Sequence, residues 1–155
     1  MRTVRNGNAL RKRRRRAQRG NNLVELGIML PVLCFLAAGL IDFGMLFYTT
    51  IELANAAQTG AEYGAQSNTR ALDTSGMQTA AVNDAHDVSG VSATATHFCQ
   101  CPDGAAANCL TGSCSGKSPR LYVKVTTQAA FTTPIPYPGL PYSTTLSRDA
   151  TMRAQ

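Results

Sequence analysis

Acidic residues are absent from the first 19 positions of this 155-residue chain, which hold nine of its 15 lysines and arginines. The rest of the chain carries six basic and nine acidic side chains, so the net charge of +6 arises in the N-terminal segment. A charge asymmetry of this kind indicates a tail that meets a membrane surface or a nucleic acid. The main basic cluster consists of Arg11, Lys12, Arg13, Arg14, Arg15, Arg16 and Arg19.

The side-chain arrangements that common enzymes use are also missing from the sequence. Its two histidines, His86 and His97, are isolated, and it has no Ser-His-Asp set, no Gly-rich phosphate loop and no carboxylate pair. Asp84, His86 and Asp87 lie close together without a nucleophile, which is typical of a solvated helix end. We therefore expect a protein that is not an enzyme and has no cofactor and no metal site.

A long apolar run follows the basic segment. The 16 residues from Leu26 to Ile41 carry no charge, and the apolar character continues to Tyr48. A bilayer core about 30 Å thick is spanned by about 20 such residues, so the run predicts a transmembrane helix over 21–48. Glu25 and Asp42 lie about 25 Å apart along such a helix, so each falls near one membrane interface. Pro31 is tolerated in a membrane helix.

The basic cluster predicts the orientation of this helix. Lysines and arginines that flank a membrane span stay in the cytoplasm. Residues 1–20 are then a basic cytoplasmic leader, and the chain after about Tyr48 lies outside the cytoplasm. A nucleic-acid role for the cluster is a weaker alternative without motif support; it predicts strongly salt-dependent DNA binding that is lost with the arginines.

The helical pattern continues beyond the membrane span. The stretch "FGMLFYTTIELANAAQTGAEYGAQ" keeps apolar residues at helical spacing and contains no signal-peptidase site at its start. We predict one helix from about Asn22 to Gln66, with residues 49–68 as its exported continuation. Gly60 and Gly64 form a G-x-x-x-G pattern that suits close packing, here against the chain's own domain.

Residues 69–155 predict a small α+β domain. A short helix is expected within residues 73–90, and strands are expected at 91–98, 121–131 and 142–154. The Pro-rich segment between the last two strands predicts a turn or extended loop. The fold class is therefore α+β, with a small antiparallel sheet packed on the outer part of the long helix.

Four of the five cysteines fall in one loop, residues 99–114, while Cys34 lies in the membrane span as a packing residue. The spacing differs from the C-x2-C pairs of zinc ribbons, and an exported loop lies in an oxidising compartment. We favour two disulfides over a metal site, each stabilising the fold by about 2–3 kcal/mol. The four candidates are Cys99, Cys101, Cys109 and Cys114, whose three connectivities the sequence leaves open.

The junction between the basic cluster and the apolar run resembles the processing site of type IV prepilins. By that resemblance a prepilin peptidase cuts between Gly20 and Asn21, and Glu25 becomes the fifth residue of the mature chain. The new α-amino group on Asn21 then lies one helical turn from Glu25, where i and i+4 groups pair. In a filament the same carboxylate can neutralise the amine of a neighbouring subunit. Asn21 replaces the phenylalanine usual in that family.

The wider sequence is similar to the TadE-like family of tight-adherence (Flp) pilus proteins. The matching elements are Val24-Glu25, Pro31, "GLIDFGMLFY", "NAAQTGAEYGA" and the final strand with its "ATMR" ending. The resemblance implies a pilin-like fold and a minor pilin or pseudopilin of the bacterial inner membrane. It also implies three partners: a prepilin peptidase, other pilins and the inner-membrane assembly platform. Asp42 lies in the family motif, which suggests pairing with a cation of a neighbouring subunit.

One alternative function remains open at this point. An uncleaved single-pass membrane protein, whose disulfide-stapled domain binds a surface ligand, has the same anchor and the same loop.

Overall fold

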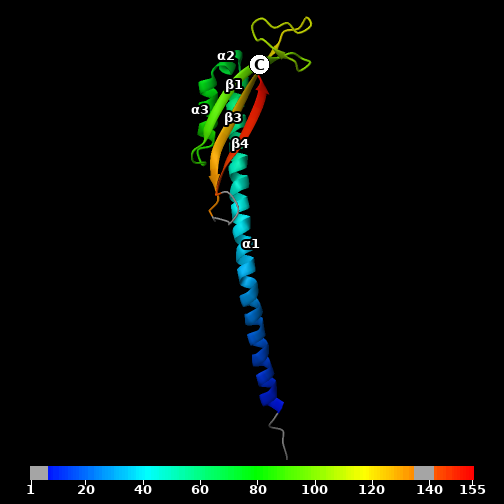
Figure 1. The fold of residues 1–155 in the computed structure, drawn as a ribbon, viewed down its shortest axis with the longest axis vertical. Helices are drawn as coiled ribbons and strands as arrows, with labels where there is room; N and C mark the ends of the chain where they lie inside the picture. The colour runs from blue at the N-terminus through cyan, green and yellow to red at the C-terminus, as the bar shows by residue number, and fades with distance from the viewer. Residues whose placement is uncertain (1–6, 135–141) are drawn as a thin grey trace, which may run out of the picture. The chain divides into compact units, whose positions relative to one another are not determined.

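The structure, a computed structural model, describes the backbone of residues 7–134 and 142–155. The side chains of residues 1–22 and 135–141 are outside the described part, as is most of the predicted Pro-rich loop. The elements in chain order are three helices and four strands (Figure 1): α1 (Gly7–Ala65), α2 (Asn68–Leu72), α3 (Thr74–Asp84), β1 (Ser92–Gln100), β2 (Ala106–Ala107), β3 (Arg120–Thr132) and β4 (Ser143–Arg153). The chain divides into two units, Met1–Phe43 and Gly44–Gln155, and α1 contributes to both.

Helix α1 begins earlier than the sequence pattern predicted. It starts at Gly7 rather than Asn22 and includes the whole basic cluster. The expected start was wrong because residues 9–19 consist of Ala, Leu, Arg, Lys and Gln, which all have high helix propensity. Gly20 interrupts this run but costs only about 1 kcal/mol in a helix. The predicted C-terminal end was close, since α1 ends at Ala65.

The four strands form one antiparallel sheet in the order β2-β1-β3-β4. The three predicted strands are present, and Val125 of β3 lies between Ala95 of β1 and Ala150 of β4. Together with the helices, this sheet confirms the α+β class. Helix α2 and strand β2 were not predicted, since each is too short to show a periodic pattern.

One face of the sheet forms the core of the second unit. Along β3 buried positions alternate with more exposed positions, because successive side chains of a strand point to opposite faces of the sheet. The buried positions are Val123, Val125, Thr127, Ala129 and Phe131. The central cluster also draws on the helices, on β1 and on the residue that follows β4: Ala61, Ala71, Met77, Ala81, Ala95 and Ala154. Most of these side chains are small, so the helices lie close to the sheet.

The C-terminal part of α1, Gly44–Ala65, packs on this core through small residues. Leu53, Ala56, Ala57 and Ala61 are fully buried. A Cβ atom placed on Gly60 would lie 2.8 Å from the backbone oxygen of Met77 and 3.1 Å from Cγ1 of Val125. The G-x-x-x-G pattern therefore serves contact with α3 and β3 inside the unit, as the sequence predicted.

Two hydrogen bonds fasten the helix to the sheet. The hydroxyl of buried Thr127 donates to the carbonyl oxygen of Leu53 over 2.7 Å. The backbone N–H of Gln155 donates to the carbonyl oxygen of Ala65 over 3.1 Å, which satisfies one acceptor at the helix C-terminus. The chain segment after β4 therefore caps α1.

Asp73 joins the short helices to α1. Its Oδ1 accepts a hydrogen bond from the N–H of Gly76 over 2.9 Å and caps α3, while its Oδ2 accepts from the Tyr63 hydroxyl over 3.0 Å. This hydrogen bond raises the pKa of Tyr63 above its usual value of 10.0; partial desolvation and the charge of Asp73 act in the same direction, and the charge of Arg70 acts against them. The phenol form of Tyr63 is thus favoured by the fold.

A first prediction concerns Gly60. Gly60→Val should lower the free energy of unfolding by about 1–3 kcal/mol, because the added methyl groups would force α1 away from Met77. Thermal unfolding of the detergent-solubilised chain, followed by circular dichroism, measures the change. Gly44→Val is the matched control, since an added Cβ there meets nothing within 4 Å beyond the adjoining turns of its own helix backbone. Equal unfolding temperatures for the two variants would contradict the packing.

A second prediction concerns alkaline pH. Because the folded state raises the pKa of Tyr63, its contribution to stability is complete below pH 10 and declines as pH rises through the raised value. Unfolding temperatures measured between pH 8 and pH 12 should therefore fall less steeply in Tyr63→Phe than in the original chain. Tyr142→Phe, at an exposed position, should keep the original slope.

Candidate functional site

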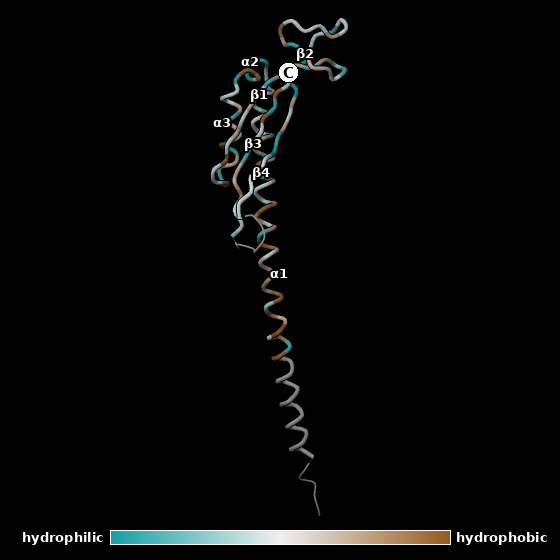
Figure 2. The backbone as a smooth tube through the Cα atoms, viewed as in Figure 1, coloured by the Kyte–Doolittle hydropathy of each residue, from teal (hydrophilic) through white to brown (hydrophobic). Residues whose placement is uncertain are grey.

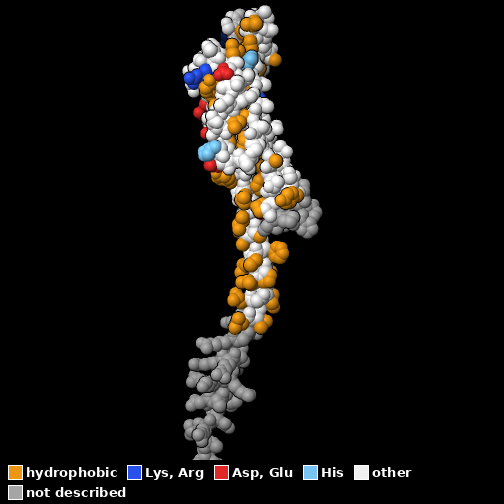
Figure 3. All heavy atoms as spheres, turned by 90° about the vertical axis from the view of Figure 1, so that its left-hand side faces the viewer, with side chains coloured by type: hydrophobic (Ala, Val, Ile, Leu, Met, Phe, Trp, Pro, Cys, Tyr) orange, Lys and Arg blue, Asp and Glu red, His pale blue; other side chains and the backbone are white. Residues whose placement is uncertain are grey.

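Large apolar side chains of α1 are exposed along the segment that the sequence assigns to a membrane. Leu23 is 71% exposed, Phe35 is 76% exposed and Leu40 is 74% exposed. The backbone of this part of the helix is coloured largely as hydrophobic in Figure 2, and hydrophobic side chains gather along it in Figure 3. Of the described helices, α1 alone is long and apolar enough to cross a bilayer. In a bilayer, lipid tails would cover these side chains, so that their apolar surface would no longer be exposed to water.

The predicted processing site lies within α1. The backbone of Gly20 and Asn21 is helical, whereas the side chains of Asn21 and of the basic cluster at 11–19 are outside the described part. Glu25 is exposed and stands four residues after Asn21, which places it one helical turn away. A peptidase that binds an extended peptide would need to unwind α1 locally, and a glycine lowers the cost of that step.

Asp42, the second acidic residue of the apolar segment, is in a different environment. Its side chain is only 7% exposed, and both carboxylate oxygens lack a hydrogen-bond partner among the described residues. A buried carboxylate is costly unless a cation or hydrogen-bond donor compensates it. The sequence predicts a position for Asp42 near a membrane interface, and the structure adds that its side chain has little exposure.

The cysteine loop carries two disulfides, as the sequence favoured. Cys99 pairs with Cys109, with Cα atoms 5.2 Å apart, and Cys101 pairs with Cys114, with Cα atoms 5.4 Å apart. The pairs interleave along the chain. Cys99 and Cys114 are buried, and β2 pairs with the end of β1 inside the loop. Cys34 is free and exposed on the apolar segment.

Neither histidine belongs to a metal-binding group among the described residues. His86 is exposed beyond the end of α3 and lies 3.1 Å from the carboxylate of its neighbour Asp87, which agrees with the solvated helix end expected there. His97 is exposed on β1, near cysteines that are bonded to each other. Among the described residues, no group of three histidine, cysteine or acidic side chains is arranged to hold a metal ion.

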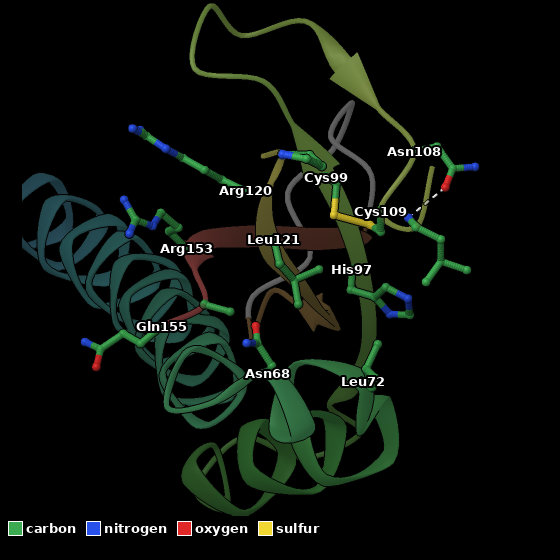
Figure 4. A pocket seen from close by; sticks show the side chains of 13 residues that line it. Asn68, Leu72, His97, Cys99, Asn108, Cys109, Arg120, Leu121, Arg153 and Gln155 are labelled. Carbon is green, nitrogen blue, oxygen red and sulfur yellow. Dashed lines mark hydrogen bonds between the residues drawn. A yellow bond between two sulfur atoms is a disulfide. The ribbon is translucent and has the colours of Figure 1, made fainter. Parts of the chain in front are cut away.

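A hollow of about 750 Å³ lies where the disulfide loop meets the ends of β1, β3 and β4. Arg120 and Arg153 lie on one side of it, and His97 and Leu72 lie on the other (Figure 4). No aspartate or glutamate side chain lines it. The sequence reasoning missed this hollow, which is called the cationic hollow below, because the two arginines come together only through strand pairing.

The comparisons with known proteins agree with this arrangement. An exposed apolar helix that continues into a small α+β unit is consistent with a membrane-anchored protein. The sequence model of the family described as TadE-like protein matches residues 23–62, so this segment is TadE-like and the family resemblance is confirmed. The family implies a protein associated with the tight-adherence pilus and its components, a class that is generally not enzymatic. No curated protein and no solved structure matches the chain.

A third prediction concerns the disulfides. Replacing both Cys99 and Cys109 with serine should lower the free energy of unfolding by about 2–3 kcal/mol, because the unfolded chain gains conformational freedom. Denaturant titration of the solubilised chain measures this loss. Cys34→Ser is the control and should leave stability unchanged, since Cys34 is free and exposed. Thiol labelling of the denatured, unreduced original chain should modify Cys34 alone; additional labelled cysteines would contradict the pairing.

Proposed function

We propose that the chain is a minor pilin or pseudopilin, cleaved after Gly20 by a prepilin peptidase and needed for assembly of a tight-adherence pilus. Its action is physical rather than catalytic. One copy of α1 anchors the protein in the bacterial inner membrane, and the second unit provides contacts to other subunits. The observation that carries the proposal is the position of Gly20 and Glu25 at the start of an exposed apolar helix with a TadE-like sequence.

Orientation and partners complete the proposal. The basic cluster holds the N-terminus in the cytoplasm, so that Gly20 meets the peptidase on that side. The second unit then lies in the periplasm, where its disulfides persist. Other pilins and the inner-membrane assembly platform are the partners that the apolar helix would contact.

Glu25 and Asp42 have different parts in this mechanism. Cleavage creates an α-amino group on Asn21, and exposed Glu25 is within one turn to receive it or the amine of a neighbouring subunit. Asp42 is almost completely buried without a described partner, so it gains most from a cation supplied by another helix. Both acids thus favour helix association over isolated chains in the bilayer.

The alternative function keeps the anchor and omits the cleavage. An uncleaved single-pass protein would display the disulfide loop toward a surface ligand. The exposed side chain of Leu110 in that loop is the observation in its favour. Retention of residues 1–20 in the mature protein separates this alternative from the proposal.

A fourth prediction tests the cleavage. The intact mass and N-terminal sequence of the membrane-extracted chain should start at Asn21 when a prepilin peptidase is co-expressed and at Met1 when it is absent. Gly20→Val should block the cut, because a branched side chain at that position hinders the extended conformation. Gly27→Val should be cut normally, because an added Cβ at this glycine of the same helix meets nothing within 4 Å beyond the adjoining turns of the helix backbone. A start at Met1 in every sample would exclude peptidase processing.

A further inference from the structure

The cationic hollow has no role in the proposed function, yet its walls have the properties of a protein-binding surface. Arg120 and Arg153 line it, and neither pairs with an acidic side chain in the described part of the chain. Leu72 is 62% exposed and Leu110 is 95% exposed at its edge. Arginine is enriched at protein interfaces, and exposed apolar side chains that gather in one place mark interaction sites.

The loop that carries Leu110 is held in place by two local constraints. The Cys99–Cys109 disulfide ties the residue before Leu110 to β1. The Oδ1 atom of Asn108 accepts hydrogen bonds from the backbone N–H groups of Leu110, over 2.9 Å, and Thr111, over 3.2 Å. Figure 4 shows the first of these bonds and the disulfide side by side. An apolar side chain presented by a fixed loop loses little conformational entropy on binding.

A surface of opposite charge lies elsewhere on the same unit. Glu52 and Glu62 of α1 and Asp84 of α3 line a shallow groove of about 340 Å³ that contains no basic side chain. Glu62 accepts a hydrogen bond from Nε2 of Gln58 over 3.0 Å, which holds its carboxylate on the groove. Ile51, which is 57% exposed, precedes Glu52 on the same helix. This acidic groove therefore offers carboxylates next to an apolar side chain, matching the arginines and leucines of the cationic hollow.

We propose that the cationic hollow of one subunit binds the acidic groove of a second copy of this chain. The two surfaces differ, so the contact is heterologous and can repeat from copy to copy without closing. Arg120 and Arg153 would face Glu52 and Glu62, while Leu110 packs against Ile51. This inference rests on the proposed role in pilus assembly and adds to it the surfaces through which successive copies meet.

The test uses the full chain in membranes with the peptidase co-expressed. The photoreactive residue p-benzoylphenylalanine replaces Leu110, whose exposed side chain leaves room for the larger residue, and irradiated adducts are mapped by mass spectrometry. The expected adduct joins two copies of the chain, with the cross-linked peptide containing residues 51–62. An adduct with another protein, with lipid or with a different region of the chain, or no adduct at all, would overturn the proposal.

Charge reversal supplies the matched comparison. Arg120→Glu with Arg153→Glu should lower the adduct yield at least about threefold, because like charges then face each other. Adding Glu52→Lys and Glu62→Lys to the same chain should restore the yield. Lys124→Glu, at a residue that pairs with Asp149 and lines neither the cationic hollow nor the acidic groove, is the control and should leave the yield unchanged. The contact would be contradicted by an adduct yield that the charge reversal leaves unchanged. It would also be contradicted by a lowered yield that Glu52→Lys with Glu62→Lys fails to restore.

The N-terminal sequence of the same preparations separates the two proposals. A mature start at Asn21 without the expected adduct removes the contact between copies and leaves the processing intact. A start at Met1 with the expected adduct present removes the peptidase processing and leaves the contact between copies intact.

Discussion

The close approach of α1 to α3 and β3 is the constraint on which the second unit depends. Gly60 and Gly64 leave no side chain between the helix and its neighbours, so Met77, Val123 and Val125 pack directly against the α1 backbone. This short separation also brings the Leu53 carbonyl within reach of the Thr127 hydroxyl. Larger residues at the two glycines would separate the helix from the sheet and break that hydrogen bond as well as the core.

Helix α1 meets two kinds of surroundings along its length. Its apolar segment exposes hydrophobic side chains around the helix, which water disfavours and lipid accepts. Its C-terminal part buries small residues on one face and presents Glu52 and Glu62 on another, as an amphipathic helix of a water-soluble unit does. Helix α1 thus contributes an apolar surface to the first unit and a packing face to the second.

The sequence predicted those features that depend on local patterns. Alternation along residues 121–131 identified β3, the uncharged run identified the apolar helix, and compartment chemistry favoured disulfides. The disulfide partners depend on where β1 ends and the loop turns, so spacing alone could not select them. Arg120 and Arg153 likewise become neighbours only because the end of β4 pairs with the start of β3, where Tyr122 lies opposite Arg153. The unpredicted start of α1 shows that a strongly basic segment still has the propensity to be helical.

The interleaved disulfides have a consequence for the resistance of the loop to proteolysis. Every peptide bond between Cys99 and Cys114 lies within at least one disulfide-closed ring, and those between Cys101 and Cys109 lie within both. A protease that cuts this exposed loop once therefore leaves both new ends covalently attached to the protein. Loss of the loop requires a second cut or reduction of a disulfide, so a single proteolytic event does not remove Leu110 from the edge of the sheet.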